Sequence, residues 1–133
     1  MGAVRNILND QLLRLSYKDP KNIRNFLRNW RGLESLSEKG DRVATCILVD
    51  LKRVTGIEPE NYNKHDRKKF NLGYLNGKLS HYQYMSIAYT LVLGYSQEEV
   101  AYVMGVDQSV VSKNINSGIK KIQKELKAHL EVD

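Results

Sequence analysis

The stretch of sequence that decides the fold is SQEEVAYVMGVDQSVVSKNINSGIKKIQKEL, residues 96–126. Ser96 can begin a helix by accepting a hydrogen bond from a first-turn N–H, and Glu99 stands three residues later in the capping-box arrangement. Gly105 tolerates the positive φ of a sharp corner, and Asp107 can cap the helix that follows. The stretch therefore predicts two helices joined by a glycine turn.

The apolar residues of this region recur at the spacing of helices that bury one face. After Asp107 the inner stripe comprises Val111, Ile115, Ile119, Ile122 and Leu126. Before the turn the inward residues are Val100, Ala101 and Met104. A preceding helix is expected from its cap Ser80 to about Leu93, where Gly94 ends it. From about Leu79 to Leu126 we therefore predict a helix-turn-helix unit whose last helix begins near Asp107.

Upstream of this unit the apolar spacing is also helical rather than alternating, which predicts an all-α protein. Helices are expected from Val4 to about Leu15, from Pro20 to about Leu33 and from Arg42 to about Thr55. Asp41 is the expected cap and Gly56 the expected stop of the last of these. Residues 32–40 are interpreted as a turn and residues 57–65 as a polar loop.

The chain is accordingly expected to have three parts. They are an N-terminal helical region (1–60), a basic linker or short helix (61–78) and the helix-turn-helix domain (79–133). Tyrosines are frequent from residue 74 to residue 102, and we expect them to pack in the core; stacking on single-stranded bases is the alternative. They are Tyr74, Tyr82, Tyr84, Tyr89, Tyr95 and Tyr102.

The charge of the chain is unevenly distributed. The net charge is +6 with a pI of about 9.4, which favours a polyanionic partner because Lys and Arg gain by neutralising phosphates. Residues 1–31 carry +5 and residues 61–79 carry +4, whereas residues 32–60 carry −2 and residues 80–133 carry −1. The basic segments Lys18–Arg31 and Lys64–Lys69 are therefore expected to hold backbone phosphates or a partner.

Several classes of function are disfavoured by what the sequence lacks. Cys46 is the single cysteine and lies in an apolar run, so it is expected to be a buried hydrophobic residue. His65, His81 and His129 lie far apart, and neither a metal nor another cofactor is expected. No glycine-rich phosphate loop or nucleophile elbow occurs, so an enzyme is not expected. With neither a membrane-length apolar segment nor an evident signal peptide, we expect a cytoplasmic protein that makes no membrane contact.

Opposite its inner stripe, the predicted last helix displays a polar face. The candidate base-reading residues are Ser109, Lys113 and Asn116 on this face, together with Gln108 and Ser112, which flank it. Gln and Asn can bond two atoms of an adenine edge, Lys can reach guanine acceptors, and Ser can contact either base. A helix kept for structure alone more often exposes Glu and Lys pairs. The face therefore predicts that this helix reads the major groove of duplex DNA.

At this point the chain shows a resemblance to a known family. The segment LSHYQYMSIAYTLVLGYSQEEVAYVMGVDQSVVSKNINSGIKKIQKEL, residues 79–126, resembles region four of sigma-70 family factors, the part that reads a promoter element. The shared features are GYSQEEVA, MGV, SVVSKNI and IKKIQKEL. DRVATCILVDLKRV, residues 41–54, is similar to what precedes this unit in small stand-alone regulators of phages and prophages.

The resemblance implies a phage or prophage transcription regulator in a bacterial cytoplasm, with RNA polymerase as a further partner. Carried over by position, the base and backbone readers would be Gln108, Ser109, Ser112 and Lys113. By the same match, the residues toward phosphates would be Lys120, Lys121 and Lys124. Additional phosphate contacts are expected from Ser96, Arg67, Lys68 and Lys69. Reading helices of sigma factors usually carry arginines, so here the basic amino-terminal segment or a homodimer is expected to supply part of the affinity.

Two other functions stay open from the residues alone. A small terminase subunit, which packages DNA, also uses a helix-turn-helix but assembles into a large ring. An interaction module that docks on host RNA polymerase would retain the fold and lose DNA binding, and the near-neutral charge of residues 80–133 is compatible with it.

Overall fold

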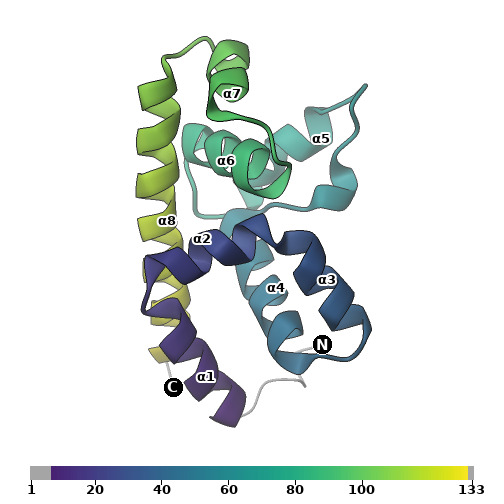
Figure 1. Cartoon of the computed structure of the whole chain (residues 1–133), viewed down its shortest axis with the longest axis vertical. Coiled ribbons are helices and arrows are strands. Elements are labelled where there is room, and N and C mark those ends of the chain that lie inside the picture. Colours follow the sequence, from purple (N-terminus) through teal and green to yellow (C-terminus); the bar gives the residue numbers. More distant parts are fainter. Residues whose placement is uncertain (1–6, 132–133) are drawn as a thin grey trace.

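The structure is a computed structural model that describes residues 7–131 (Figure 1). This part of the chain is helical and contains no named strand, so the prediction of an all-α protein is confirmed. The helices are α1 (Ile7–Tyr17), α2 (Pro20–Arg28), α3 (Trp30–Glu38), α4 (Arg42–Thr55), α5 (Lys68–Asn71), α6 (His81–Ile87), α7 (Gln97–Met104) and α8 (Gln108–Glu131). Within residues 7–131, no helix combines the length and the apolar character that crossing a membrane requires.

The long helix α8 organises the molecule. It has 24 residues and runs along one side, with α6 and α7 packed near its amino-terminal end (Figure 1). Further along, α1, α2 and α4 pack against the same helix. The short helix α5 lies on the side of the molecule away from α8 (Figure 1). Helix α8 therefore connects the expected helix-turn-helix region to the expected N-terminal region.

The core is one continuous cluster of buried side chains. It includes Leu27 and Leu51 from the N-terminal half, Phe70 from α5, and Tyr84 from α6. All five residues of the expected inner stripe of α8 are buried, with exposed fractions of 3% or less. The division at residues 60 and 78 stays a prediction, but the core itself shows no break at either point.

The expected helix caps at Ser80, Ser96 and Asp41 and the expected glycine stops are confirmed. Ser80 and Ser96 each form a capping box, with Gln83 and Glu99 as the respective partners. The side chain of Asp41 accepts a hydrogen bond of 2.9 Å from the backbone N–H of Ala44. Gly56, Gly94 and Gly105 all adopt positive φ, at 76°, 85° and 69°. These positions stop helices because glycine adopts left-handed backbone without a Cβ clash.

The region between Pro20 and Gly40 differs from the prediction. A single helix to about Leu33 followed by a turn was expected, but α2 ends at Arg28 and a second helix, α3, occupies Trp30–Glu38. The Asn29 side chain folds back over Gly32, where a Cβ would lie 2.2 Å from the Asn29 Oδ1. Gly32 therefore accommodates the corner between two helices rather than ending one. Helix α3 is held because Trp30 and Leu33 are buried and α3 packs against α4.

A second correction concerns the helix that begins after Ser80. It is α-helical only to Ile87, and residues Ala88–Val92 form a π-helical segment instead. The backbone N–H of Leu93 bonds to the carbonyl of Ala88, five residues earlier. Such segments are rare and local, and the apolar spacing of the sequence gives no sign of them.

The tyrosines follow the packing expectation in part. Tyr84 and Tyr89 are buried, and they join Phe70 and Tyr62 in a cluster of tilted and edge-to-face ring contacts. Tyr82 and Tyr102 do not follow it, since they are 45% and 88% exposed. The side chains of this cluster are also hydrogen-bonded: the hydroxyl of Tyr89 donates to the Asn71 Oδ1, and that of Tyr84 donates to the Phe70 carbonyl.

The tyrosine cluster predicts a loss of stability in alkali. Burial raises the pKa of the Tyr84 and Tyr89 hydroxyls above the usual value of about 10. The folded chain therefore holds these protons while the unfolded chain releases them, so stability is full below pH ~10 and falls as the pH rises above it. Urea unfolding should give a lower free energy of unfolding at pH 11 than at pH 8. This difference should be smaller in Tyr84→Phe, because phenylalanine cannot ionise. An equal difference in that variant would show that Tyr84 does not contribute to the loss of stability.

Candidate nucleic-acid interface

The outward face at the amino-terminal end of α8 carries the candidate base-reading residues. Helix α8 begins at Gln108, directly after Asp107, whose backbone carbonyl accepts the first bonds of the helix. Gln108, Ser109, Lys113 and Asn116 are exposed, and Ser112 is half-buried at the margin. The structure therefore brings all five candidates together on the first turns of one helix. Ser109, Lys113 and Asn116 lie opposite its buried stripe, and Gln108 and Ser112 flank them.

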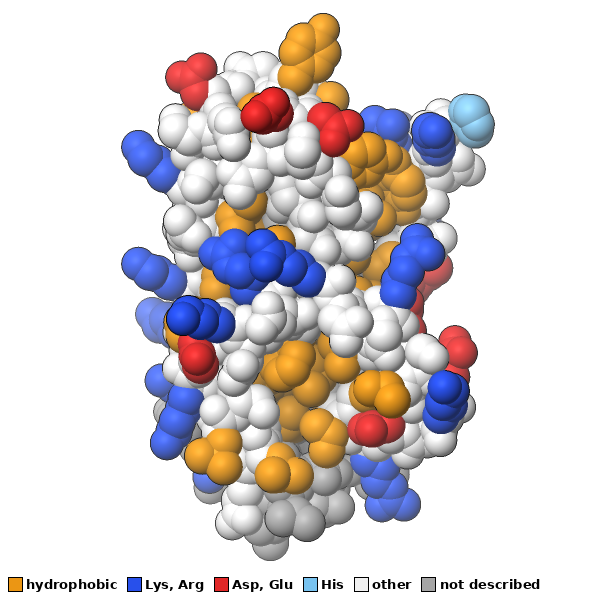
Figure 2. All heavy atoms as spheres, viewed as in Figure 1, with side chains coloured by type: hydrophobic (Ala, Val, Ile, Leu, Met, Phe, Trp, Pro, Cys, Tyr) orange, Lys and Arg blue, Asp and Glu red, His pale blue; other side chains and the backbone are white. Residues whose placement is uncertain are grey.

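A row of lysines continues this face along α8. With about 100° of rotation per residue, the side chains of Lys113, Lys120, Lys124 and Lys127 leave the helix on the same side. All four are exposed, and the row spans about 21 Å at 1.5 Å per residue. Figure 2 shows basic side chains along the edge that α8 forms. We call these four residues the lysine row; Lys121 is also exposed but points about a quarter turn away from it.

Helix α2 borders this face on one side. Its buried residues Ile23 and Leu27 are fully enclosed in the core. The Nη2 of Arg24 donates a hydrogen bond of 2.8 Å to the Oδ1 of Asn116. The Nε2 of Gln123 donates to the carbonyls of Tyr17 and Lys18, at 2.9 and 2.8 Å. Figure 2 shows a basic group over α2, close to the α8 edge.

Helix α6 borders the same face on its other side. The Nε2 of Gln83 donates to the Oγ of Ser117 at 3.2 Å. A Cβ placed on Gly118 would lie 2.4 Å from the Cδ1 of Ile87, so the absence of a side chain there lets the two helices approach. Gly118 lowers the helix propensity of α8 by about 1 kcal/mol relative to alanine, and this close packing is its structural reason.

Ser96 lies at the start of α7, where its hydroxyl already serves the helix cap. The Oγ of Ser96 accepts from the backbone N–H of Glu99 at 3.0 Å. In return the Glu99 carboxylate accepts from the Ser96 N–H, and these bonds lower the pKa of that carboxyl. Glu98 and Glu99 thus place negative charge beside the expected phosphate contact at Ser96, and this charge opposes the approach of a phosphate.

Arg67, Lys68 and Lys69 lie elsewhere, at the start of α5 on the side of the molecule away from α8 (Figure 1). The Arg67 guanidinium carbon is 5.9 Å from the centre of the Tyr62 ring, in a cation–π contact. The structure therefore does not bring these three residues together with the candidate base readers.

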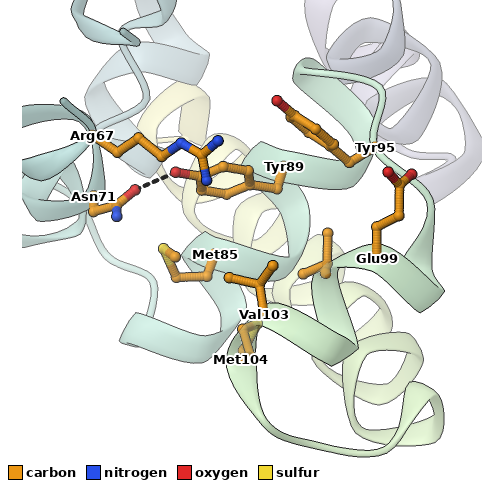
Figure 3. A pocket seen from close by; sticks show the side chains of 9 residues that line it. Arg67, Asn71, Met85, Tyr89, Tyr95, Glu99, Val103 and Met104 are labelled. Atoms are coloured by element: carbon orange, nitrogen blue, oxygen red, sulfur yellow. Dashed lines mark hydrogen bonds between the residues drawn. The ribbon is translucent and has the colours of Figure 1, made fainter. Parts of the chain in front are cut away.

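Arg67 instead lines a pocket between α5, α6 with its π-helical extension, and α7 (Figure 3). The pocket has a volume of about 170 Å³. Its wall is mostly apolar, and Arg67 and Glu99 are its charged residues. The lining comprises Arg67, Asn71, Met85, Tyr89, Tyr95, Glu99, Val100, Val103 and Met104. Val103 and the neighbouring Tyr102 leave an apolar protrusion beside it, since they are 70% and 88% exposed.

Comparison with protein-family models, with curated proteins and with solved structures finds no match to the chain. The resemblance to sigma region four therefore rests on the residues quoted from the sequence.

Sequence reasoning missed two features of this interface. The first is Lys127, which completes the lysine row and is recognisable by its seven-residue spacing from Lys120. The second is the contact of Arg24 with Asn116, which joins residues 92 positions apart. The arginine-rich face of α2 was visible in the sequence as a basic segment, but its position beside α8 was not.

Proposed function

We propose that the chain is a sequence-specific duplex DNA-binding transcription regulator of phage or prophage type, built on a helix-turn-helix formed by α7 and α8. The single observation that supports this most is the outward face of α8. Its first turns expose Gln, Ser, Lys and Asn, and the lysine row continues from them along the same side. An α-helix with such a face fits the major groove of B-form DNA.

The residues of the face divide into two roles. Gln108 and Asn116 are suited to adenine edges, and Lys113 is suited to the acceptors of guanine. Ser109 and Ser112 can contact either kind of base or a phosphate. Lys120, Lys124 and Lys127 lie further from the start of the helix and are placed to neutralise backbone phosphates, with Lys121 beside them.

Base reading by α8 predicts a loss of specificity without a loss of fold. Duplex DNA bound by the chain is first selected from random sequence and sequenced. Lys113→Ala with Asn116→Ala should then abolish preference for the selected site, because each bidentate base contact contributes about 1–3 kcal/mol of discrimination. Mobility shifts on selected and scrambled duplexes measure this.

The matched control is Lys68→Ala, which removes one exposed positive charge from the side of the molecule away from α8. It should retain the preference, and circular dichroism should be unchanged in every variant. Preserved sequence preference in the double variant would exclude α8 as the reading helix.

A second candidate function is a protein-interaction module, and the exposed Tyr102 and Val103 on α7 favour it. By the resemblance, the proposed partner is host RNA polymerase. This function predicts no duplex binding at low salt together with co-purification of polymerase. It also predicts that Tyr102→Ser with Val103→Ser abolishes the co-purification, whereas a DNA-reading regulator would keep its duplex binding in that variant.

A further inference from the structure

We infer that α2 is a second DNA-contacting element, fixed beside α8, and that Arg24 positions the Asn116 side chain for base reading. This inference rests on the proposed function, because it names further residues of the same interface. It assigns to α2 a contact with the phosphate backbone next to the groove that α8 enters.

The first step is that α2 cannot move independently of α8. Ile23 and Leu27 have no exposed surface and belong to the same core cluster as the inner stripe of α8. The chain entering α2 is also held, because Gln123 of α8 bonds to the carbonyls of both Tyr17 and Lys18. Any duplex that seats against α8 therefore meets α2 in a fixed place.

The second step is the charge of the outward face of α2. Lys21, Arg24 and Arg28 stand at helical spacing on one side, away from the buried Ile23 and Leu27. Helix α2 contains these three basic residues and no acidic one. A basic face of this kind beside a reading helix suits a phosphate backbone, since each neutralised phosphate releases bound counterions.

The third step concerns the orientation of the Asn116 amide. The Arg24 guanidinium can only donate, so the Asn116 atom that it contacts at 2.8 Å must be the carbonyl oxygen. This contact turns the Asn116 NH₂ away from Arg24 and leaves one lone pair of Oδ1 unused. An asparagine that reads adenine needs this arrangement, with Oδ1 accepting from the base amino group and Nδ2 donating to the ring nitrogen. Arg24 therefore restricts Asn116 to a base-reading orientation before DNA arrives.

The position of the Arg24–Asn116 contact also limits the length of α8 that can contact bases in the groove. Asn116 stands eight residues after the start of α8, about 12 Å along the helix axis. Helix α2 borders α8 at the level of Asn116. Base contacts should therefore come from residues between Gln108 and Asn116, and the DNA backbone past these bases should face α2 and the lysine row. The protected stretch of DNA should accordingly extend past the bases that are read.

The test uses the full chain and the selected duplex, with variants Arg24→Ala and Arg28→Ala. Binding is measured by fluorescence anisotropy across a salt series, on the selected site and on single-base changes. Arg28→Ala should weaken binding and reduce the slope of log affinity against log salt by about 0.9, with base discrimination unchanged. Arg24→Ala should weaken binding similarly and also reduce discrimination about tenfold at the base whose readout Asn116→Ala abolishes.

Combining Arg24→Ala with Asn116→Ala should cost no more discrimination than Asn116→Ala alone. The control Lys68→Ala should change neither the salt slope nor the discrimination. If Arg24→Ala and Arg28→Ala both behave like Lys68→Ala, α2 is not part of the interface. If Arg24→Ala matches Arg28→Ala at every base, the positioning role is wrong while the backbone contact stands. If the unsubstituted chain binds no duplex at low salt, the proposed function itself fails. This result is distinct from the two outcomes that concern α2 and Arg24.

Discussion

Ile122→Ala is expected to lower the free energy of unfolding of the whole chain by about 2–5 kcal/mol, the usual cost of emptying a buried isoleucine site. Ile122 has no exposed surface and lies on the inner stripe of α8, which packs against helices from both halves of the chain. Because one core cluster includes residues from α1 to α8, the loss should affect the N-terminal helices as well as α6 and α7.

Trp30 makes this prediction measurable, since it is the single tryptophan and lies buried in α3. Urea unfolding should be followed in parallel by Trp30 fluorescence and by far-ultraviolet circular dichroism. Both signals should shift to lower urea together in Ile122→Ala. Lys121→Ala, an exposed neighbour on the same helix, should stay within about 0.5 kcal/mol of the unsubstituted chain. Separate transitions for the two signals would show that the halves unfold independently.

Gly56→Ala is expected to cost about 2–4 kcal/mol, because two independent penalties act at this position. Gly56 has a φ of 76°, which a residue with a Cβ rarely adopts. In addition, a Cβ here would lie 2.0 Å from the carbonyl oxygen of Gly73. That oxygen belongs to the backbone of the segment that follows α5, so it cannot turn aside as a side chain could.

Gly40→Ala is the matched control, since Gly40 also has a positive φ, at 93°, but a Cβ there meets nothing within 4 Å. It should carry the backbone penalty alone, about 1 kcal/mol. The difference between the two variants in urea unfolding measures how much the approach of residues 56 and 73 contributes. Equal losses would mean that the segment after α5 relaxes away from α4 at little cost.

The parts of the fold that could be predicted depend on residues close together in the sequence. The cap at Ser80, the capping box at Ser96 and the glycines at Gly56 and Gly105 each follow from a few neighbouring residues, and the sequence predicts all of them. The inner stripe of α8 was also predictable, because its apolar spacing continues without interruption from Val111 to Leu126.

The parts that could not be predicted depend on distant contacts. The corner at Asn29 accompanies the burial of Trp30 and Leu33 in α3, which packs against α4. The apolar spacing from Pro20 to Leu33 fits one straight helix equally well. Likewise, the basic segments around Arg24 and Arg67 look alike in sequence. The tertiary structure places one beside the outward face of α8 and the other beside Tyr62.

The two faces of α8 share no residue: the inner stripe is enclosed in the core, while the outward face holds the candidate readers and the lysine row. Substitutions on the outward face should therefore be nearly neutral for folding, as exposed positions usually are. Such a scaffold is suited to rapid retargeting. Under the proposed function, a few exchanges at Gln108, Lys113 or Asn116 could redirect the protein to a new DNA site, while the interior that holds the helix in place stays unchanged.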